Sequence, residues 1–283
     1  KFAQEKHDTI VGQMKKMGAW LDWSREVYTF DDARNMAVNK VFKELHEDGL
    51  IERGHRMIHW SVGAQSVLSD DELEWEDRTE PFYILRCGEF LVGTVRSETK
   101  CSDSPVVVHP EGSYVRVKHQ EETFIFSKNL FDDKERLAKE LNFLEGEFEL
   151  LETLKGKDLV GQSFEYDTYA GKRKFFVLAD EEVIDMDKGT GAMTISVCHS
   201  ADDYLLAQKH KAKLKDYFFE KLDAHGKMTS QAGPCEGLLV DDARKKSAEI
   251  MREKGLLVGE NKSYIHRVPI CYRSGCVVEP MIS

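Results

Sequence analysis

The sequence predicts an α+β fold in which short strands curl into a β-barrel with peripheral helices, flanked by a small connective segment. Two observations carry this prediction. From about residue 78 onward, short apolar runs are separated by turn residues, without the regular strand–helix alternation of a parallel sheet. Helical patterns stand before, between and after these runs rather than in a repeating unit. This mixture is typical of an α+β domain whose strands close on one another.

The first predicted element is a helix over residues 29–49. Thr29 and Asp32 stand at the spacing of a capping box, and Gly49 follows as a stop signal. Residues 50–60 then look extended. The apolar face of the helix consists of Val38, Val41, Phe42 and Leu45.

An acidic run at residues 70–77 follows this region. It reads Asp-Asp-Glu-Leu-Glu-Trp-Glu-Asp, and so many carboxylates favour a solvated connection between two bodies. We therefore expect a domain boundary after residue 77.

Two hairpins come next. The first is predicted from residues 82–86 and 89–95 around Cys87-Gly88, and the second from residues 114–118 and 123–127 around Gln120-Glu121.

The rest of the chain mixes helices and strands. Residues 131–157 carry leucines at near-helical spacing and predict a helical excursion. Strands are expected at residues 174–178 and 192–197. Two further helices are expected, one beginning near Ser200 and one from about residue 241 to Gly255.

Composition narrows the class of protein. Of the 283 residues, 41% are hydrophobic and 32% are charged, which is typical of a soluble globular protein. The apolar runs are too short to cross a bilayer, so we expect a cytoplasmic protein with no membrane contact. The net charge of −11 argues against a broad electrostatic grip on nucleic acid. The chain opens at Lys1 without an initiator Met, so we expect a piece of a longer protein.

The six cysteines indicate free thiols rather than a disulfide framework, because they are scattered through the chain. Cys271 and Cys276 are the only close pair. A structural zinc usually needs a second pair or added His ligands, so we expect no metal, with a degenerate zinc ribbon at this end as the alternative.

Two polar motifs stand out against this background. The first begins at Gly93, where an apolar run ends, and places Thr94, Arg96, Glu98 and Thr99 before Asp103. The second reads Gly189-Thr190-Gly191-Ala192 and continues to His199-Ser200-Ala201-Asp202-Asp203-Tyr204. Polar groups at strand ends can line a pocket, so we expect the two motifs to lie side by side with a pocket between them.

These motifs resemble the editing domain inserted in valyl-tRNA synthetases, class I enzymes whose first motif reads approximately T-T-R-P-E-T, then G-D and V-H-P. The stretch Val106-Val107-Val108-His109-Pro110 matches the V-H-P ending. Residues 12–18 resemble the segment that enters the insertion, and Val277-Val278-Glu279-Pro280-Met281 resembles the point where it rejoins the core. The resemblance therefore covers nearly the whole chain, as a connective segment at 1–77, an editing domain at 78–266 and a returning segment at 267–283.

The resemblance implies an aminoacyl-tRNA deacylase that hydrolyses the ester of mischarged Thr-tRNA(Val). Its partners would be the tRNA(Val) acceptor end and the misattached threonine, and it would act as a monomer. Editing needs no cofactor. ATP and Mg²⁺ belong to the ligase core, whose signatures H-I-G-H and K-M-S-K-S do not occur here. The chemistry has a clear purpose, because an apolar pocket rejects an added hydroxyl only by about a hundredfold.

The resemblance also assigns roles to single residues. Asp203 would anchor the substrate ammonium, although its spacing from Ser200 alone favours a capping box. Thr94 and Thr99 would bind the ester or the hydroxyls, or be ordinary strand threonines. The segment that binds the substrate and the tRNA end would further comprise Arg96, Glu98, Thr194, Ser196, His199, Ser200, Gly189 and Gly191.

Several of these residues have a plainer interpretation. Arg96 would hold the terminal adenosine, or form a surface ion pair with Glu98 or Asp103. Ser196 would contact the substrate side chain, or face solvent. His199 resembles a general base, yet a His beside a helix start is more often structural. Backbone N–H groups near Gly189–Gly191 or at Ser200 would stabilise the oxyanion.

Departures from the family pattern leave three functions open. Val95 and Ser97 replace a Thr and a Pro, while Thr194 and Ser200 replace a Lys and an Asp that help recognise threonine's hydroxyl. The first function is an active hydrolase. The second is a connective, tRNA-orienting module with lost or weak editing. The third is an isoleucine-type editing domain that removes valine, which His199-x-x-Asp202-Asp203-Tyr204 favours.

Overall fold

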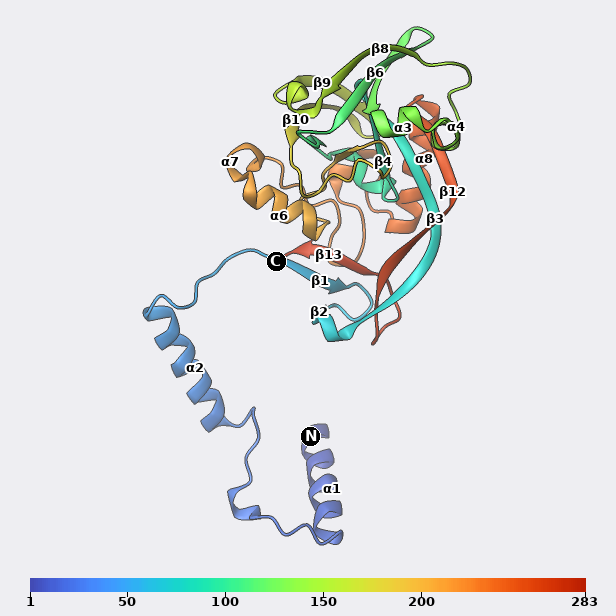
Figure 1. The fold of residues 1–283 in the computed structure, drawn as a ribbon. Coiled ribbons are helices and arrows are strands. Elements are labelled where there is room, and N and C mark those ends of the chain that lie inside the picture. Colours follow the sequence, from blue (N-terminus) through green and yellow to red (C-terminus); the bar gives the residue numbers. More distant parts are fainter. The chain divides into compact units, whose positions relative to one another are not determined.

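The computed structural model describes residues 1–283, which form two compact units, Lys1–Gly54 and His55–Ser283. The N-terminal unit contains α1 (Phe2–Lys16), the short 3-10 helix η1 (Trp23–Arg25) and α2 (Asp32–Glu47) (Figure 1). Neither α-helix buries a residue. No helix of the structure is both long and apolar enough to cross a bilayer.

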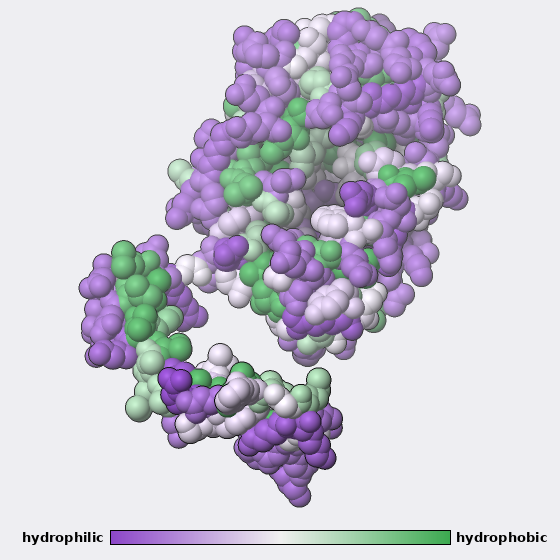
Figure 2. All heavy atoms as spheres, turned by 60° about the horizontal axis from the view of Figure 1, so that its bottom comes forward, coloured by the Kyte–Doolittle hydropathy of each residue, from purple (hydrophilic) through white to green (hydrophobic).

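Helix α2 confirms the helix predicted at residues 29–49, but it begins later. The Asp31 side chain accepts the backbone N–H of Arg34 at 2.8 Å, so Asp31 rather than Thr29 is the N-cap. Gly49 follows the C-cap with a φ of +70°, as its role as a stop requires. Val38, Val41 and Phe42 of the predicted apolar face are exposed and Leu45 is half-buried, and Figure 2 shows an apolar band along this helix.

The C-terminal unit is built on three sheets. The smallest has the order β13-β1-β2, the second β11-β5-β10-β9 and the largest β12-β3-β4-β7-β6-β8. In chain order the strands are β1 (Met57–Ser61), β2 (Ser66–Leu68), β3 (Leu73–Cys87), β4 (Phe90–Thr94), β5 (Val106–Val108), β6 (Ser113–His119), β7 (Glu122–Ser127), β8 (Glu149–Lys155), β9 (Ser163–Thr168), β10 (Gly171–Ala179), β11 (Ala192–Thr194), β12 (Leu257–Cys271) and β13 (Val278–Ile282).

Helices fill the connections between these strands. The α-helices are α3 (Lys128–Asp132), α4 (Lys134–Glu140), α5 (Gly156–Leu159), α6 (Ala201–Lys209), α7 (Lys211–Leu214) and α8 (Val240–Glu253). The 3-10 helices are η2 (Asp70–Glu72), η3 (Ser97–Cys101) and η4 (Ser230–Cys235). Helices α6 and α8 confirm the two helices predicted after residue 200.

The α+β class predicted from the sequence is confirmed, but the strands do not close into a barrel. The reason lies at β11, which forms a ladder with β5 only and approaches β4 without backbone pairing. The second and largest sheets therefore meet along β4 and β11 through side chains and isolated hydrogen bonds. One such bond runs from Thr190 Oγ1, just before β11, to the backbone oxygen of Leu91 in β4 at 2.5 Å.

Both predicted hairpins are confirmed. Strands β3 and β4 pair antiparallel from Tyr83–Thr94 to Cys87–Phe90, and the turn contains Gly88 at a φ of +64°. Strands β6 and β7 pair antiparallel around Gln120, whose φ is +55°. A positive φ at the tight turn is what a right-twisted hairpin requires.

One local prediction was wrong. Residues 131–157 are helical only near their two ends, in α3, α4 and the start of α5, because residues 149–155 form β8 and pair with β6. The acidic run at residues 70–77, expected as a solvated connection, has regular secondary structure. It forms η2 and the start of β3, whose register with β12 runs from Leu73–Cys271 to Leu85–Leu257. Cross-strand pairing with a distant partner has overridden the local charge pattern. The functional boundaries at residues 77 and 266 stay predictions.

The start and the end of the C-terminal unit meet in the smallest sheet. Strand β1 pairs antiparallel with β13, from Met57–Ile282 to Ser61–Val278. Beyond the strands, Arg56 and Ser283 exchange backbone hydrogen bonds of 3.0 Å in both directions. In Figure 1 the long strands β3 and β12 lead from this small sheet to the rest of the unit.

Helix η3 is held in place from two sides. Ser97 Oγ donates to the backbone oxygen of Arg244 in α8 at 2.9 Å, and Ser247 Oγ donates to Ser97 Oγ at 3.0 Å. On the other side the Tyr169 hydroxyl donates to the backbone oxygen of Glu98 at 2.5 Å. Because Ser97 and Tyr169 are fully buried, η3 is part of the core rather than a free loop.

Candidate functional site

The two polar motifs lie side by side, as predicted. Strand β4 ends at Thr94 and runs beside β11, which ends at Thr194. The Arg96 guanidinium donates to the backbone oxygen of His199 at 3.2 Å, and Lys100 Nζ donates to Thr194 Oγ1 at 2.9 Å. Residues about a hundred positions apart in the sequence therefore share one site.

Thr94 and Thr99 both make local hydrogen bonds. Thr94 Oγ1 accepts the backbone N–H of Arg96 at 2.9 Å and so closes the turn that leaves β4. Thr99 lies in η3 rather than on a strand, and its hydroxyl is 3.0 Å from the Arg96 oxygen and 3.1 Å from Asp103 Oδ2. Both side chains are buried, and their hydrogen bonds hold the turn after β4 and the start of η3 in place.

Arg96 and Glu98 belong to a buried ion-pair network rather than to a surface pair. Arg96 donates to Glu98 Oε1 at 2.9 Å and to Glu279 Oε2 at 2.8 Å. Arg244 donates to both oxygens of Glu98, at 3.0 and 3.2 Å. Burial alone would raise the pKa of Glu98, but the two guanidiniums hold it below its ordinary value. Asp103 is not the partner of Arg96.

Asp103 is held instead by two lysines. Lys100 Nζ donates to Asp103 Oδ2 at 2.6 Å, and Lys221 Nζ donates to Asp103 Oδ1. All three groups are nearly or fully buried. Burial alone would raise the pKa of Asp103, but the two ammonium groups hold it below its ordinary value. The carboxylate is therefore ionised at neutral pH.

Asp203 has a different environment, because no cation forms an ion pair with it. Its Oδ2 accepts the backbone N–H of Ser196 at 2.7 Å. Burial raises the pKa of Asp203 to about 6, and the Ser196 N–H opposes that rise. The capping box expected with Ser200 is only half formed: Ser200 Oγ accepts the Asp203 N–H at 3.3 Å, but the Asp203 carboxylate turns away to Ser196.

His199 is buried and neutral. Its Nε2 accepts the backbone N–H of Lys221 at 2.8 Å, which places the ring proton on Nδ1. Burial, and after it the nearby charges of Lys221 and Arg96, lower the pKa of His199 to about 3. A ring nitrogen that already accepts a backbone N–H has no free lone pair for a water, so the geometry supports the structural interpretation.

Gly189 and Gly191 adopt positive φ values of +51° and +70°. A Cβ on Gly191 would stand 2.6 Å from Ser127 Cβ, so both the conformation and the close approach require glycine. The Gly189 oxygen accepts from Arg136 at 2.6 Å, and the Gly191 oxygen accepts from the Tyr114 hydroxyl at 2.6 Å. The loop is therefore fixed on both sides.

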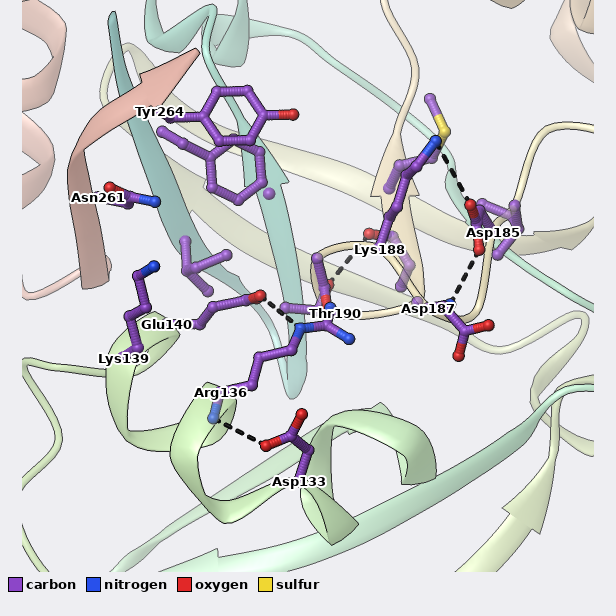
Figure 3. A pocket seen from close by; sticks show the side chains of 18 of the residues that line it. Asp133, Arg136, Lys139, Glu140, Asp185, Asp187, Lys188, Thr190, Asn261 and Tyr264 are labelled. Atoms are coloured by element: carbon purple, nitrogen blue, oxygen red, sulfur yellow. Dashed lines mark hydrogen bonds and ion pairs between the residues drawn. The ribbon is translucent and has the colours of Figure 1, made fainter. Parts of the chain in front are cut away.

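A cavity of about 670 Å³ opens beside this loop (Figure 3). One wall comes from α4, with Arg136 and Lys139, and the opposite wall from the loop with Lys188 and Thr190. Tyr264 of β12 stacks on Phe82 of β3, with ring centroids 4.8 Å apart, and offers an aromatic face. We call this space the outer cavity.

A second cavity of about 560 Å³ lies beside the second motif. Asp203 and Ser200 line it, together with residues before and within α6. We call it the inner cavity. Val183 and Met193 line both cavities, so the two spaces adjoin at these side chains. Neither cavity is lined by Thr94 or Thr99, so the pocket expected between Thr99 and Asp203 opens on the Met193 side of the site instead.

Sequence reasoning does not identify four residues of the site. Glu279 is noted only as part of the returning segment, and Lys100 stands unremarked between Thr99 and Asp103. Lys221 and Arg244 follow or sit within runs of lysines, which are typical of solvated surface. Only the position of Lys100 inside the first motif offered a signal.

No group of three or more His, Cys, Asp or Glu side chains in the structure is arranged to hold a metal ion. All six cysteines are free, and Cys276 Sγ lies 2.9 Å from Ser274 Oγ.

Comparison with known proteins places the chain in a family. The family model "tRNA synthetases class I (I, L, M and V)" matches residues 1–228. Over its whole length the chain is 32% identical to the Valine--tRNA ligase of Thermotoga maritima and 31% identical to that of Desulfotalea psychrophila. It spans only 28% and 27% of the lengths of these two relatives.

Among solved structures, the chain is similar to the P. knowlesi cytosolic leucyl-tRNA synthetase editing domain, with a TM-score of 0.40 and 16% sequence identity. That match covers 63% of this chain and 83% of the other. The assignment to a family rests on the family model, which covers well over half of the sequence: this chain belongs to the class I tRNA synthetases of the I, L, M and V group.

Proposed function

We propose that this chain is the editing module of a valine-type tRNA synthetase and hydrolyses the ester of mischarged Thr-tRNA(Val). The alignment with valine--tRNA ligases over the whole chain supports the valine assignment. The observation that carries the proposal is the environment of Asp203, a buried carboxylate without a cationic partner that lines the inner cavity.

An unpaired buried carboxylate is suited to a ligand that brings its own positive charge. Burying a lone charge is costly, and a cation from the ligand offsets that cost. The α-ammonium of an aminoacyl ester is such a group. In the proposed complex it lies at Asp203 Oδ1, while Oδ2 keeps the Ser196 N–H.

Hydroxyl groups near Asp203 suit the rest of the aminoacyl group. Thr194 and Ser196 lie two residues apart and point to the same side as Asp103 and its lysines. We propose that they contact the ester and the threonine hydroxyl. Water then adds to the ester carbon, and the resulting oxyanion collapses. The ribose oxygen leaves with a proton, which yields free threonine and tRNA.

The outer cavity suits the terminal nucleoside of the tRNA. Its lining carries three cationic side chains but also Asp133, Glu135, Glu140, Asp185 and Asp187. A lining this acidic does not hold phosphates broadly, whereas the exposed face of Tyr264 can stack on a base. Because Val183 and Met193 line both cavities, the proposed nucleoside and aminoacyl sites are neighbours in the fold.

The direct test is deacylation of charged tRNA by the 283-residue chain. We expect hydrolysis of Thr-tRNA(Val) above the rate without protein, and much slower hydrolysis of Val-tRNA(Val). Val-tRNA(Ile) tests the isoleucine-type alternative, and preferential hydrolysis of that ester would replace the valine assignment. No acceleration with any of the three esters would overturn the editing proposal.

A second function, a tRNA-orienting module without hydrolysis, is favoured by one observation. The charged side chains of the first motif are already engaged within the protein, since Arg96 and Glu98 pair with Glu279 and Arg244. Binding of tRNA(Val) with unchanged ester lifetime in the same assay would support this second function.

A further inference from the structure

Lys100 and Lys221 both form ion pairs with Asp103, and neither lysine has a role in the mechanism above. Lys221 donates to one carboxylate oxygen and Lys100 to the other. Each ammonium also reaches one hydroxyl of the second motif: Lys221 Nζ lies 2.7 Å from Ser196 Oγ, and Lys100 Nζ lies 2.9 Å from Thr194 Oγ1. The site thus contains two parallel chains of the form carboxylate–ammonium–hydroxyl.

The direction of these hydrogen bonds is fixed by chemistry. A lysine ammonium has three donors and no acceptor, so both hydroxyls must accept from it. Each hydroxyl then has its own hydrogen to donate. Neither Ser196 Oγ nor Thr194 Oγ1 donates to any atom of the protein, so each hydroxyl hydrogen lacks a partner within the fold. Both residues are buried and lie beside Asp203 rather than in the lining of the inner cavity itself. A hydroxyl that accepts from a cation is a stronger donor than a free one.

Asp103 and its two lysines also lie near Asp203. The charges that act on Asp203 come from Lys100 and Asp103, in and just after η3, and from Lys221, just before Leu222. The nearby His199 is neutral. The two lysines and the two carboxylates balance in charge when both Asp side chains are ionised. Removing one lysine therefore leaves one negative charge too many in a buried site.

We infer that Lys221 is a positioning residue for ester hydrolysis: it holds Asp103 and directs the Ser196 hydroxyl as a donor toward the substrate carbonyl. Lys100 does the same for Thr194. The inference rests on the proposed editing function and adds Lys221, which lies in neither sequence motif, and Lys100, to which the sequence analysis gave no role. In the reaction, Ser196 donates to the oxygen that gains negative charge as water adds to the ester carbon, and Lys221 itself transfers no proton.

The test compares Lys221→Met with wild type in Thr-tRNA(Val) deacylation over a range of pH. We expect kcat to fall by about tenfold or more and KM to change by less than about twofold, because the donor is aimed at the transition state. The rising limb of the pH–rate profile, which reports ionisation of Asp203, should move to higher pH because a nearby positive charge is lost. The shift of the limb reports that the Lys221 charge lies near Asp203, and the fall in kcat above the limb reports the loss of the directed donor.

Two further variants make the result specific. Ser196→Ala should lower kcat as much as Lys221→Met but leave the limb in place, because the charges remain. Lys227→Met is the matched control, since Lys227 is exposed, lies six residues away and pairs with nothing through its side chain. It should behave as wild type.

The outcomes separate the two levels of the argument. Suppose that the wild-type chain is active and that Lys221→Met has the same kcat and the same rising limb of the pH–rate profile. That result overturns the inference and leaves the proposed function standing. If Lys221→Met does not fold, as judged by its melting curve, Ser196→Ala decides: wild-type kcat in that variant also overturns the inference. A wild-type chain that hydrolyses none of the esters overturns the proposed function, and the role of Lys221 with it.

Discussion

The backbone N–H of Ser196 donates to Asp203 Oδ2 at 2.7 Å, and this is the only hydrogen bond that the Asp203 carboxylate makes within the protein. The bond joins the second residue after β11 to the first turn of α6. It fixes the carboxylate beside the Ser196 hydroxyl and leaves Oδ1 for a ligand. Several expectations depend on this arrangement.

Replacing Asp203 by Asn should remove most deacylation while the chain stays folded. The amide can still accept the Ser196 N–H, but it cannot pair with an ammonium, and loss of a partner for a buried charge costs about 2–5 kcal/mol of binding. The measurement is kcat/KM for Thr-tRNA(Val). Asp216→Asn, at an exposed position outside both cavities, is the control. Full activity in Asp203→Asn would remove Asp203 from the site.

The same substitution should stabilise the fold at pH 8. Burial raises the pKa of Asp203 to about 6 from an ordinary 3.8, so the folded state holds this proton more tightly than the unfolded state. The stability that this proton contributes to the folded state is fully present below about pH 4 and is lost as the pH rises through 6. Its size is about 1.4 kcal/mol for each unit by which folding shifts the pKa. Asp203→Asn should therefore melt higher than wild type at pH 8 and equally at pH 4. A lower melting temperature at pH 8 contradicts this expectation.

His199 should have the opposite effect on stability. Its pKa falls from 6.5 to about 3 on burial, so the unfolded state binds the proton first as the medium is acidified. The stability that neutral His199 contributes is complete above pH 6.5 and is lost as the pH falls toward 3. Urea unfolding at pH 7.5 and 4.5 should show a smaller loss in His199→Gln, whose amide can accept the Lys221 N–H. Equal losses in both proteins would count against a buried neutral ring.

Gly191→Ala should destabilise the protein by more than backbone strain alone. A side chain at a φ of +70° costs about 1–3 kcal/mol, and the new Cβ also meets Ser127 Cβ. Gly161→Ala separates the two effects, because Gly161 has a φ of +85° and no atom within 4 Å of a built Cβ. We expect Gly191→Ala to cost at least about 1 kcal/mol more in urea unfolding. Equal costs would mean that the loop yields easily.

Tyr264→Ala should weaken substrate binding without slowing the chemistry. Stacking of a base on an aromatic side chain is worth about 1–3 kcal/mol, so KM for Thr-tRNA(Val) should rise by about fivefold or more at unchanged kcat. Tyr272→Ala provides a control, since Tyr272 is exposed and lies outside the outer cavity. An unchanged KM would place the terminal base elsewhere.

The sequence was informative where structure depends on neighbouring residues. The hairpin at Gly88 and the helix start at Ser200 were predicted because turns and caps are set within a few positions. Residues 149–155 were misread as helical because their leucines fit helical spacing, and only pairing with β6 makes them a strand.

The charged part of the site could not be predicted in the same way. The bond between Lys221 and Asp103 joins residues 118 positions apart, and that between Arg244 and Glu98 spans 146. A lysine that becomes buried looks the same in sequence as one on the surface. Its burial depends on which distant carboxylate the fold places beside it.

The pairing of β1 with β13 has a consequence for how such a unit can be joined to other proteins. A polypeptide that enters at Arg56 and leaves at Ser283 does so through two residues that hydrogen-bond to each other, about one strand spacing apart. A host chain could carry the whole unit at a single tight turn, because the inserted residues would leave its flanking segments as close together as a hairpin does. Transplanting the unit from His55 to Ser283 into a surface loop of an unrelated protein should therefore leave both folds intact.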